Sequence, residues 1–454
     1  MKQNSLIEGK ITSALIKFTI PILLALLLQT TYGMVDLLIV GNFSQVRDVS
    51  GVSTGSQLIT LLTAICNGLA MGTTILIGRV VGRNKMEEIP NIIRSTTHVF
   101  IVFGIVVMGT IFFFIDPIIA LLNTPTDAIV QTKNYIMIST IGIPLIFSYN
   151  ILGSIFRGLG DSKTPLIAVA IACVVNITLD LIFVAGFSMG AAGAAIATVV
   201  SQGISVILCM IMINGKDVIQ ISKRNNTIIS RYYSKEIIRL GLPVALQSGL
   251  VSISFLAITV IVNQFGLVYS ASIGLVEKLT GIIMLVPMAF MNSLTVFVAQ
   301  NNANNQLPRS KEGLKKAFII SSVFSSLMAF VAYFHGDILI RLFSSDIAVI
   351  EAATIYLKAY AFDTLLVPII FCLSGYFSGS GQTLYVMVQG IFGSLALRIP
   401  LTYYFSLKQP VSLFQIGLAI PISTLIQIGF FLLYYYYYDQ KLKKANDPVH
   451  VVQD

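Results

Sequence analysis

Charged residues are scarce in this chain. Of its 454 residues, 11% are Asp, Glu, Lys or Arg and 56% are hydrophobic, and the mean hydropathy is +0.86. Soluble domains contain about 25% charged residues. The composition therefore excludes a soluble globular protein and predicts an integral membrane protein.

Motifs for several other functions are also missing. The three histidines, His98, His335 and His450, lack the spacing of a metal site. The four cysteines lie inside apolar runs, which indicates packing residues rather than a disulfide framework. The chain has no Gly-x-x-x-x-Gly-Lys-Ser/Thr phosphate-binding loop and no TVGYG-type selectivity filter. We therefore expect no enzyme and no cofactor, and an ion gradient of H⁺ or Na⁺ as the energy source for any uphill transport.

Twelve apolar segments are each long enough to cross a membrane. A transmembrane helix needs about 20 apolar residues, and the short alternating blocks of a membrane β-barrel are absent. The expected fold is an all-α integral membrane protein with twelve transmembrane helices. The expected segments are residues 13–41, 51–78, 94–115, 133–155, 165–186, 191–213, 237–263, 270–298, 314–334, 354–376, 384–406 and 415–437.

Positive charges are distributed unequally between the two sets of loops. One set contains Arg47, Lys133, Arg341, Lys358 and Lys408, and the other contains all the remaining loop lysines and arginines. Cytoplasmic loops carry the excess of Lys and Arg. We therefore predict a multi-pass protein of a prokaryotic plasma membrane with both termini in the cytoplasm. The same distribution accounts for the net charge of +9 without a nucleic-acid partner.

The two halves of the chain resemble one another. IKFTIP, ending at Pro21, matches IRLGLP, ending at Pro243, at an offset of 222 residues, and FRGLG at 156–160 matches FSGSG at 377–381. We expect two six-helix lobes, residues 1–225 and 226–454, related by a pseudo-two-fold axis along the membrane normal. Such parallel repeats are typical of transporters, with the binding site near the midplane. The alternative is an old duplication without mechanistic meaning.

A carboxylate, Asp36, lies near the outer end of the first segment. A charge at the centre of a membrane helix costs roughly 2.5–3.5 kcal/mol on insertion scales. At about 1.5 Å per residue, Asp36, Asp180 and Thr198 lie at a shared depth in three segments, and Asn176 is one turn from Asp180 on the same face. We predict that these four side chains converge on a cation or proton site. The alternative is a structural hydrogen-bonding network between helices.

Three charged residues, Glu277, Asp363 and Arg398, fall inside segments of the second half. Because an unpaired charge there is costly, we expect a Glu277–Arg398 or an Asp363–Arg398 contact. These residues either take part in substrate binding and coupling or form a structural charge pair. In the first half, Pro21 removes a backbone hydrogen bond, so it permits either a bend coupled to protonation of Asp36 or a static kink.

Glycines and aromatic residues suggest packing and lining roles. Four glycines of the second segment form a small-residue ridge that allows close helix packing; they are Gly68, Gly72, Gly78 and Gly82. Aromatic side chains together with Gln29 would line a cleft suited to flat amphipathic cations; they include Tyr32, Phe147, Tyr149 and Phe156.

The order and spacing of several motifs resemble the multidrug and toxic compound extrusion (MATE) family, closest to its DinF-type drug-efflux branch. These motifs are PILLALLLQTTYGMVDLLIVG (21–41), FRGLGDSKTP (156–165), NITLD (176–180), GAAGAAIATVVSQ (190–202) and RIPLTYYF (398–405). The resemblance covers nearly the whole chain. It implies a secondary active multidrug exporter that exchanges amphipathic, mainly cationic compounds for H⁺ or Na⁺ by alternating access.

The resemblance also implies site residues. The family's cation and substrate pocket in the N-terminal lobe maps onto Asp36, Asn176, Asp180 and Thr198, and its bending proline maps onto Pro21. The glutamate that the NorM-type branch carries after the second proline is absent, because that region reads LVSIS at 250–254. The cation site of that branch in the C-terminal lobe is therefore not expected here.

Two other classes of function are less consistent with the sequence. A flippase for lipids or lipid-linked sugars would need a cationic cleft for an anionic headgroup, whereas the buried acids in this chain outnumber Lys278 and Arg398. An intramembrane enzyme or a structural subunit is disfavoured by the internal repeat. The expected partners are small organic molecules and the bilayer, and the expected state is a monomer.

Overall fold

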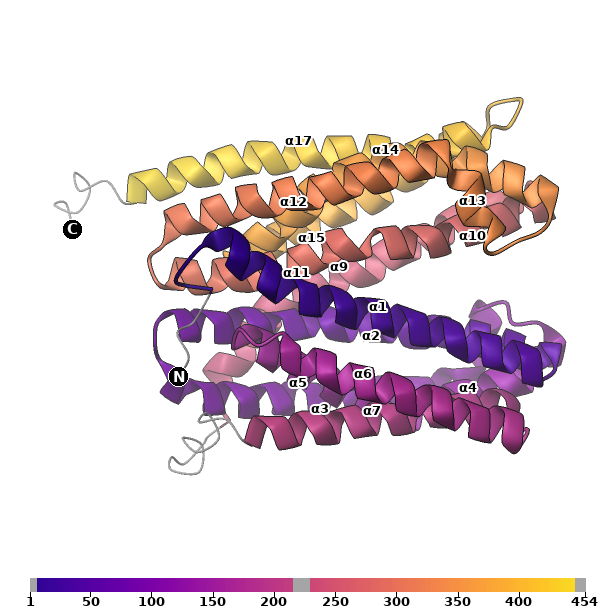
Figure 1. The fold of residues 1–454 in the computed structure, drawn as a ribbon, viewed down its shortest axis with the longest axis horizontal. Helices are drawn as coiled ribbons and strands as arrows, with labels where there is room; N and C mark the ends of the chain where they lie inside the picture. Colours follow the sequence, from indigo (N-terminus) through magenta and orange to yellow (C-terminus); the bar gives the residue numbers. More distant parts are fainter. Residues whose placement is uncertain (1–5, 215–228, 446–454) are drawn as a thin grey trace. The chain divides into compact units, whose positions relative to one another are not determined.

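The computed structural model describes residues 6–214 and 229–445. Nearly all of this part is helical, and Figure 1 follows the helices in chain order. The helices of the first half are α1 (Ile11–Phe43), α2 (Val46–Gly82), η1 (Met86–Glu88), α3 (Ile89–Leu121), η2 (Thr126–Ala128), α4 (Ile129–Ile141), α5 (Ile143–Gly158), α6 (Lys163–Asp180), η3 (Leu181–Gly186) and α7 (Gly190–Asn214). Those of the second half are α9 (Arg231–Asn263), α10 (Leu267–Ile283), α11 (Leu285–Ala303), α12 (Leu307–Phe334), α13 (Gly336–Arg341), α14 (Ile347–Gly379), α15 (Thr383–Ile391), η4 (Phe392–Arg398), α16 (Ile399–Ser406) and α17 (Leu413–Ala445).

The expected transmembrane segments are all present. Ten helical stretches within the described residues are long and apolar enough to cross a membrane, and two bent helix pairs raise the number to twelve. Each of the twelve expected segments falls in one of these stretches or pairs. The prediction of an all-α protein with twelve transmembrane helices is confirmed.

Two of the twelve segments are not single straight helices. α4 and α5 meet at Gly142 with a bend of 53°, and α10 and α11 meet at Met284 with a bend of 42°. In each pair a proline, Pro144 or Pro287, lies within the first residues of the second helix. Proline supplies no backbone N–H and clashes with the preceding turn, and each of the spans expected over 133–155 and 270–298 is divided into two helices just before its proline.

The chain forms two compact units, called here the first and second unit. The first contains residues 1–249, 292–316 and 375–384, and the second contains residues 250–291, 317–374 and 385–454. The predicted lobe boundary at residue 225 falls in segment 215–228, outside the described residues.

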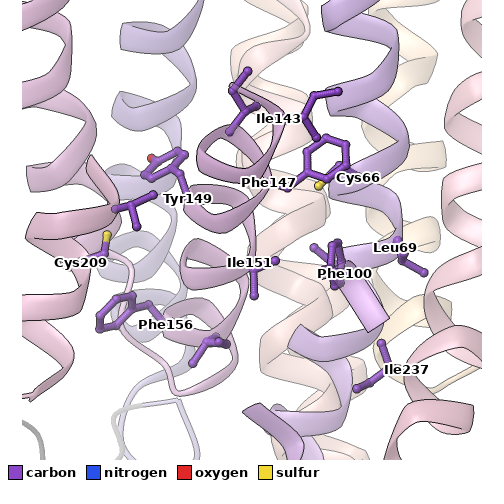
Figure 2. Close-up of a cluster of buried hydrophobic side chains, with 14 of the residues drawn as sticks. Cys66, Leu69, Phe100, Ile143, Phe147, Tyr149, Ile151, Phe156, Cys209 and Ile237 are labelled. Carbon is purple, nitrogen blue, oxygen red and sulfur yellow. The ribbon is translucent and has the colours of Figure 1, made fainter. Parts of the chain in front are cut away.

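An apolar core holds the first unit together. α6 packs between α1 and α7, and α2 packs against α4 and α5. Figure 2 shows part of this core, where Phe147 and Tyr149 of α5 lie among side chains from several other helices. The Phe147 ring also stacks on Phe103 of α3, with centroids 5.4 Å apart. This core packs α5 beside α2.

The glycine ridge of α2 is a close packing surface. A Cβ on Gly68 would lie 2.5 Å from the Cα of Ala245, and one on Gly72 would collide with the carbonyl oxygen of Ile237, both on α9. Farther along, a Cβ on Gly78 would meet Ala299 of α11 at 3.1 Å. Side chains would prevent this approach, so these small residues fix the spacing of the helices.

The second unit has its own apolar core. Buried side chains of α10, α13 and α14 pack there, including Ile273, Ile340 and Tyr356. The π-helix η4 packs against α17. η4 ends at Arg398, so this packing positions the guanidinium inside the unit.

Candidate functional site

Asp36 lies buried seven residues before the end of α1. Its carboxylate accepts a hydrogen bond of 3.3 Å from Thr198 Oγ1 of α7. α1 is helical throughout its length, so the depth of Asp36 follows from its place in the sequence. The contact joins residues 162 positions apart in the chain, as the shared-depth argument predicted.

α6 contributes two further polar side chains to this place. Asn176 and Asp180 are both buried and lie one turn apart on one face, and both interact with the Asp36 carboxylate. Asp180 is the last residue of α6, and the π-helix η3 begins at the next residue. Asp180 therefore lies where the backbone of this span passes from α-helix to π-helix. π-helical turns occur frequently at functional sites.

Several polar atoms of this cluster lack hydrogen-bond partners. Within the described residues, no hydrogen bond reaches Asp36 Oδ1, either carboxylate oxygen of Asp180 or the side-chain amide of Asn176. No described Lys or Arg is among the groups that act on Asp36 or Asp180. Buried polar groups are normally satisfied, and oxygen atoms are the ligands that hard cations prefer. The geometry therefore suits a proton or a small cation bound between α1 and α6.

Two polar side chains near the cluster were not predicted. Gln202 of α7 donates a hydrogen bond of 3.3 Å to the Tyr32 hydroxyl, and the buried Tyr135 of α4 is close enough to interact with both Asp36 and Asp180. Tyr135 belongs to an apolar cluster with Val184 and other residues around the C-terminal end of α1. A single tyrosine or glutamine in an apolar helix gives no sequence signal, although Tyr135 does align with Tyr356 in the internal repeat.

Pro21 and Gln29 lie elsewhere along α1. Pro21 is buried, and the helix continues through it. Gln29 interacts with the hydroxyl of Tyr149, which also donates a hydrogen bond of 3.4 Å to the carbonyl oxygen of Pro165. A bend of α1 at Pro21 remains a prediction.

The four aromatic side chains expected near a cleft lie in two different surroundings. Phe147, Tyr149 and Phe156 are all buried in the apolar core of the first unit (Figure 2). Tyr32 is half-buried beside the carboxylate cluster. An aromatic residue fits a packed core and a cleft equally well from sequence alone, so the sequence leaves open which of the four line a cleft, and the lining role stays a prediction.

The charged residues of the second unit surround two tyrosines. Glu277, Asp363 and Arg398 all act electrostatically on Tyr356 and Tyr360 of α14. The three charges come from α10, α14 and η4, and Figure 1 labels the first two of these helices. The three charges therefore act on the same two side chains of α14.

Arg398 does not pair directly with either acid. Its Nη1 donates a hydrogen bond of 3.3 Å to Ser254 Oγ, and its guanidinium lies 4.7 Å from the centre of the Phe255 ring. Within the described residues, neither Glu277 nor Asp363 lies within 4 Å of it. The expected ion pair was wrong because two α9 residues hold the guanidinium, and it acts on Asp363 over a longer distance. Glu277 instead accepts a hydrogen bond of 3.3 Å from Thr259.

The internal repeat shows how the two units differ chemically. At the offset of 222 residues that relates Pro21 to Pro243, Asn176 corresponds to Arg398 and Asp180 to Thr402. Asp36 corresponds to Ile258. In the first unit no described Lys or Arg acts on the carboxylate pair, whereas in the second unit Arg398 acts on Asp363.

Comparisons with known proteins agree with this repeat. The family model described as MatE matches residues 21–182 and 243–404, two stretches that begin 222 residues apart. A relative described as "Probable multidrug resistance protein YpnP" from Bacillus subtilis (strain 168) is 29% identical over 410 residues, which cover 89% of this chain and 91% of the relative. "Multidrug export protein MepA" from Staphylococcus aureus (strain MRSA252) is 24% identical over 393 residues, covering 85% and 86%.

Solved structures share the fold. A structure described as a MOP superfamily transporter from Pyrococcus furiosus superimposes with a TM-score of 0.90 at 20% identity, covering 98% of this chain and 99% of that one. A structure described as MATE in complex with MaD3S gives the same values. At this identity the likeness concerns the arrangement of the helices.

Proposed function

The chain belongs to the MatE family, whose model matches both halves, and on this premise we propose that it is a secondary active multidrug exporter. It exchanges amphipathic, mainly cationic organic compounds for H⁺ or Na⁺ by alternating access. The observation that carries this proposal is the buried Asp36–Asp180 pair, whose oxygens lack hydrogen-bond donors apart from Thr198 within the described residues.

The coupling mechanism follows from the repulsion between two carboxylates. Two like charges 4 Å apart repel by roughly 4 kcal/mol at an effective dielectric constant of 20. A proton or Na⁺ shared by Asp36 and Asp180 removes this repulsion and holds α1 against α6. The two carboxylates therefore titrate as one unit. When the cation leaves, the repulsion returns and α1 is no longer held against α6. Cation binding therefore changes the relative free energy of the two conformations between which the transporter alternates.

The substrate class is inferred from charge and from the relatives. Bare carboxylates favour cationic compounds, and the relatives YpnP and MepA are described as multidrug resistance and multidrug export proteins. We propose the plasma membrane as the location, with both termini in the cytoplasm, and a monomer as the working unit. Its organic substrates and the bilayer would be its partners, and transported H⁺ or Na⁺ would replace any bound cofactor.

A lipid flippase is the second candidate. One observation favours it, because the buried Arg398 of the second unit would attract an anionic headgroup. The carboxylate pair of the first unit favours cationic cargo instead. Transport of a fluorescent lipid without transport of a cationic dye would support the flippase.

The test is efflux of a fluorescent cationic dye from proteoliposomes with an imposed pH or Na⁺ gradient. Asp36→Asn should reduce gradient-driven efflux at least tenfold. Asp116→Asn is the matched control, because Asp116 is an exposed carboxylate paired with Lys133 at 2.6 Å and should transport normally. Unchanged efflux in Asp36→Asn would overturn the assigned role, and efflux that ignores both gradients would overturn the antiport.

A further inference from the structure

A cavity lies in the first unit, far along α1 from the carboxylate pair. It has a volume of about 630 Å³, and its lining comes from the beginning of α1 and the first turns of α12. This volume is within the usual range of ligand-binding pockets, about 300–1,000 Å³. Lys17, the lining residue of α1 closest in sequence to Asp36, is 19 residues before it, or roughly 28 Å along the helix. The cavity is therefore separate from the site described above.

The cavity is strongly basic. Lys10, Lys17 and Lys316 line it together with a single acid, Glu312, which leaves an excess of two positive charges. Among the described residues, no carboxylate lies within 4 Å of any of the three lysine ammonium groups. The cavity thus presents unpaired cations to an anion.

The backbone adds donors to the same place. α1 begins at Ile11, its N-cap residue Lys10 provides no side-chain cap, and its first turn contains no acidic residue. Thr12 and Ser13 of this turn also line the cavity. The first backbone N–H groups of a helix have no partner within the helix, and the helix dipole favours an anion there.

The chain that leads into α1 is fixed in place. Arg309 of α12 donates hydrogen bonds of 2.8 Å to the carbonyl oxygen of Gly9 and 3.1 Å to that of Glu8. Asn301 of α11 donates one of 3.1 Å to the carbonyl oxygen of Leu6. These bonds anchor the beginning of α1 to α11 and α12, so the cavity is preformed.

An apolar stripe continues from the cavity along α1. Ile16 lines the cavity, and Ile20, Leu24 and Leu27 follow at helical spacing on the same face. Their side chains are 49%, 42% and 42% exposed. A ligand with an anionic head and an apolar tail would contact both the basic cavity and the apolar stripe, whereas a soluble anion would contact only the basic cavity.

From these observations we propose that the cavity binds the phosphodiester headgroup of an anionic phospholipid. Lys10, Lys17, Lys316 and the first-turn amides of α1 contact the phosphate, and the acyl chains lie along Ile16, Ile20 and Leu24. Basic pockets between transmembrane helices on the cytoplasmic side bind such headgroups. The inference holds whether or not the protein is an antiporter, because it uses neither Asp36 nor Asp180.

The chain offers a direct experiment because it contains no tryptophan. Ile20→Trp places a single fluorescent reporter one turn beyond the cavity. Bilayers that contain brominated phosphatidylglycerol or brominated phosphatidylcholine then report which lipid occupies this place, through quenching of the reporter. We expect a preference for phosphatidylglycerol of roughly fivefold or more.

Matched variants separate the site from general surface charge. Replacing Lys10, Lys17 and Lys316 together with Gln should abolish the preference, and replacing Lys85, Lys163 and Lys235 with Gln should leave it intact. Glu312→Gln removes the one acid of the cavity and should increase the preference for phosphatidylglycerol. This single variant still tests the proposal if the first triple variant does not fold. Equal quenching by both lipids, equal loss in both triple variants, or an unchanged preference in Glu312→Gln would each overturn the proposal. Displacement by inorganic phosphate at constant ionic strength would overturn the lipid in favour of a soluble anion.

Discussion

The Thr198 hydroxyl of α7 donates a 3.3 Å hydrogen bond to the Asp36 carboxylate of α1. It is the one hydrogen bond found for this carboxylate among the described residues. α6 lies between these two helices in the packing of the first unit. This hydrogen bond therefore connects α1 to α7, on either side of α6, the helix that carries Asn176 and Asp180.

Removing this hydroxyl should destabilise the protein. A hydrogen bond to a charged group contributes about 1.5–3 kcal/mol, so Thr198→Val should lower the melting temperature in ion-free buffer, whereas Thr198→Ser should preserve it. The four cysteines are buried and free, and a thiol-reactive dye added during heating would report unfolding. Equal melting temperatures for the Val and Ser variants would show that the hydrogen bond is not formed in the membrane protein.

Asp36 and Asp180 should behave as one functional unit. Asp36→Asn or Asp180→Asn alone should abolish ion-coupled efflux, and the double variant should be no worse than either single variant. In stability measurements the two substitutions should be non-additive by about 0.5–3 kcal/mol, as expected for groups in contact. Additive effects in a double-mutant cycle would mean that the carboxylates act separately.

Glycine substitutions should distinguish the α2 ridge from an open helix face. Gly72→Ala would place a methyl group against the Ile237 carbonyl of α9, and such overpacking costs about 1–3 kcal/mol. Gly109→Ala on α3 is the control, because nothing lies within 4 Å of its added Cβ. Thermal unfolding of the two variants should show a loss for Gly72→Ala and no loss for Gly109→Ala; the reverse order would contradict the packing of α2 against α9.

Substitutions of Arg398 should be costly even when they keep the charge. Arg398→Met removes the hydrogen bond to Ser254 and the cation that acts on Asp363 from beyond 4 Å, so stability should fall by about 1–3 kcal/mol. Arg398→Lys keeps the charge but loses the planar contact with Phe255, so stability should be intermediate. Full stability of Arg398→Met in a thermal unfolding assay would show that the guanidinium does not compensate Asp363.

The sequence predicts the helices well because the signal is local. Membrane spans need long apolar runs, and these are visible one segment at a time. The depth of Asp36, Asp180 and Thr198 follows from counting residues, which brought them correctly to one place. Their role as a cation site remains a prediction.

The contacts that the sequence did not predict depend on the rotation of each helix about its own axis. Counting residues gives the height of Arg398 in its span but not the direction of its side chain, so the contact with Phe255 and Ser254 was missed. The position of Tyr135 beside the carboxylates was missed for the same reason, because the sequence shows only one polar residue among apolar neighbours and not the direction of its side chain. The bends at Gly142 and Met284 depend on how a proline is accommodated, and that depends on packing rather than on hydropathy.

The π-helix that begins after Asp180 has a mechanical consequence. A π-turn is a one-residue insertion in an α-helix, and each residue of an α-helix turns by about 100°. If the inserted residue moved to the other side of Asp180, the carboxylate would rotate by about 100° around α6 while both ends of the helix stayed in place. A shift of backbone hydrogen bonds by a single turn would then separate Asp180 from Asp36 without sliding a helix through the bilayer, which would open the proposed cation site.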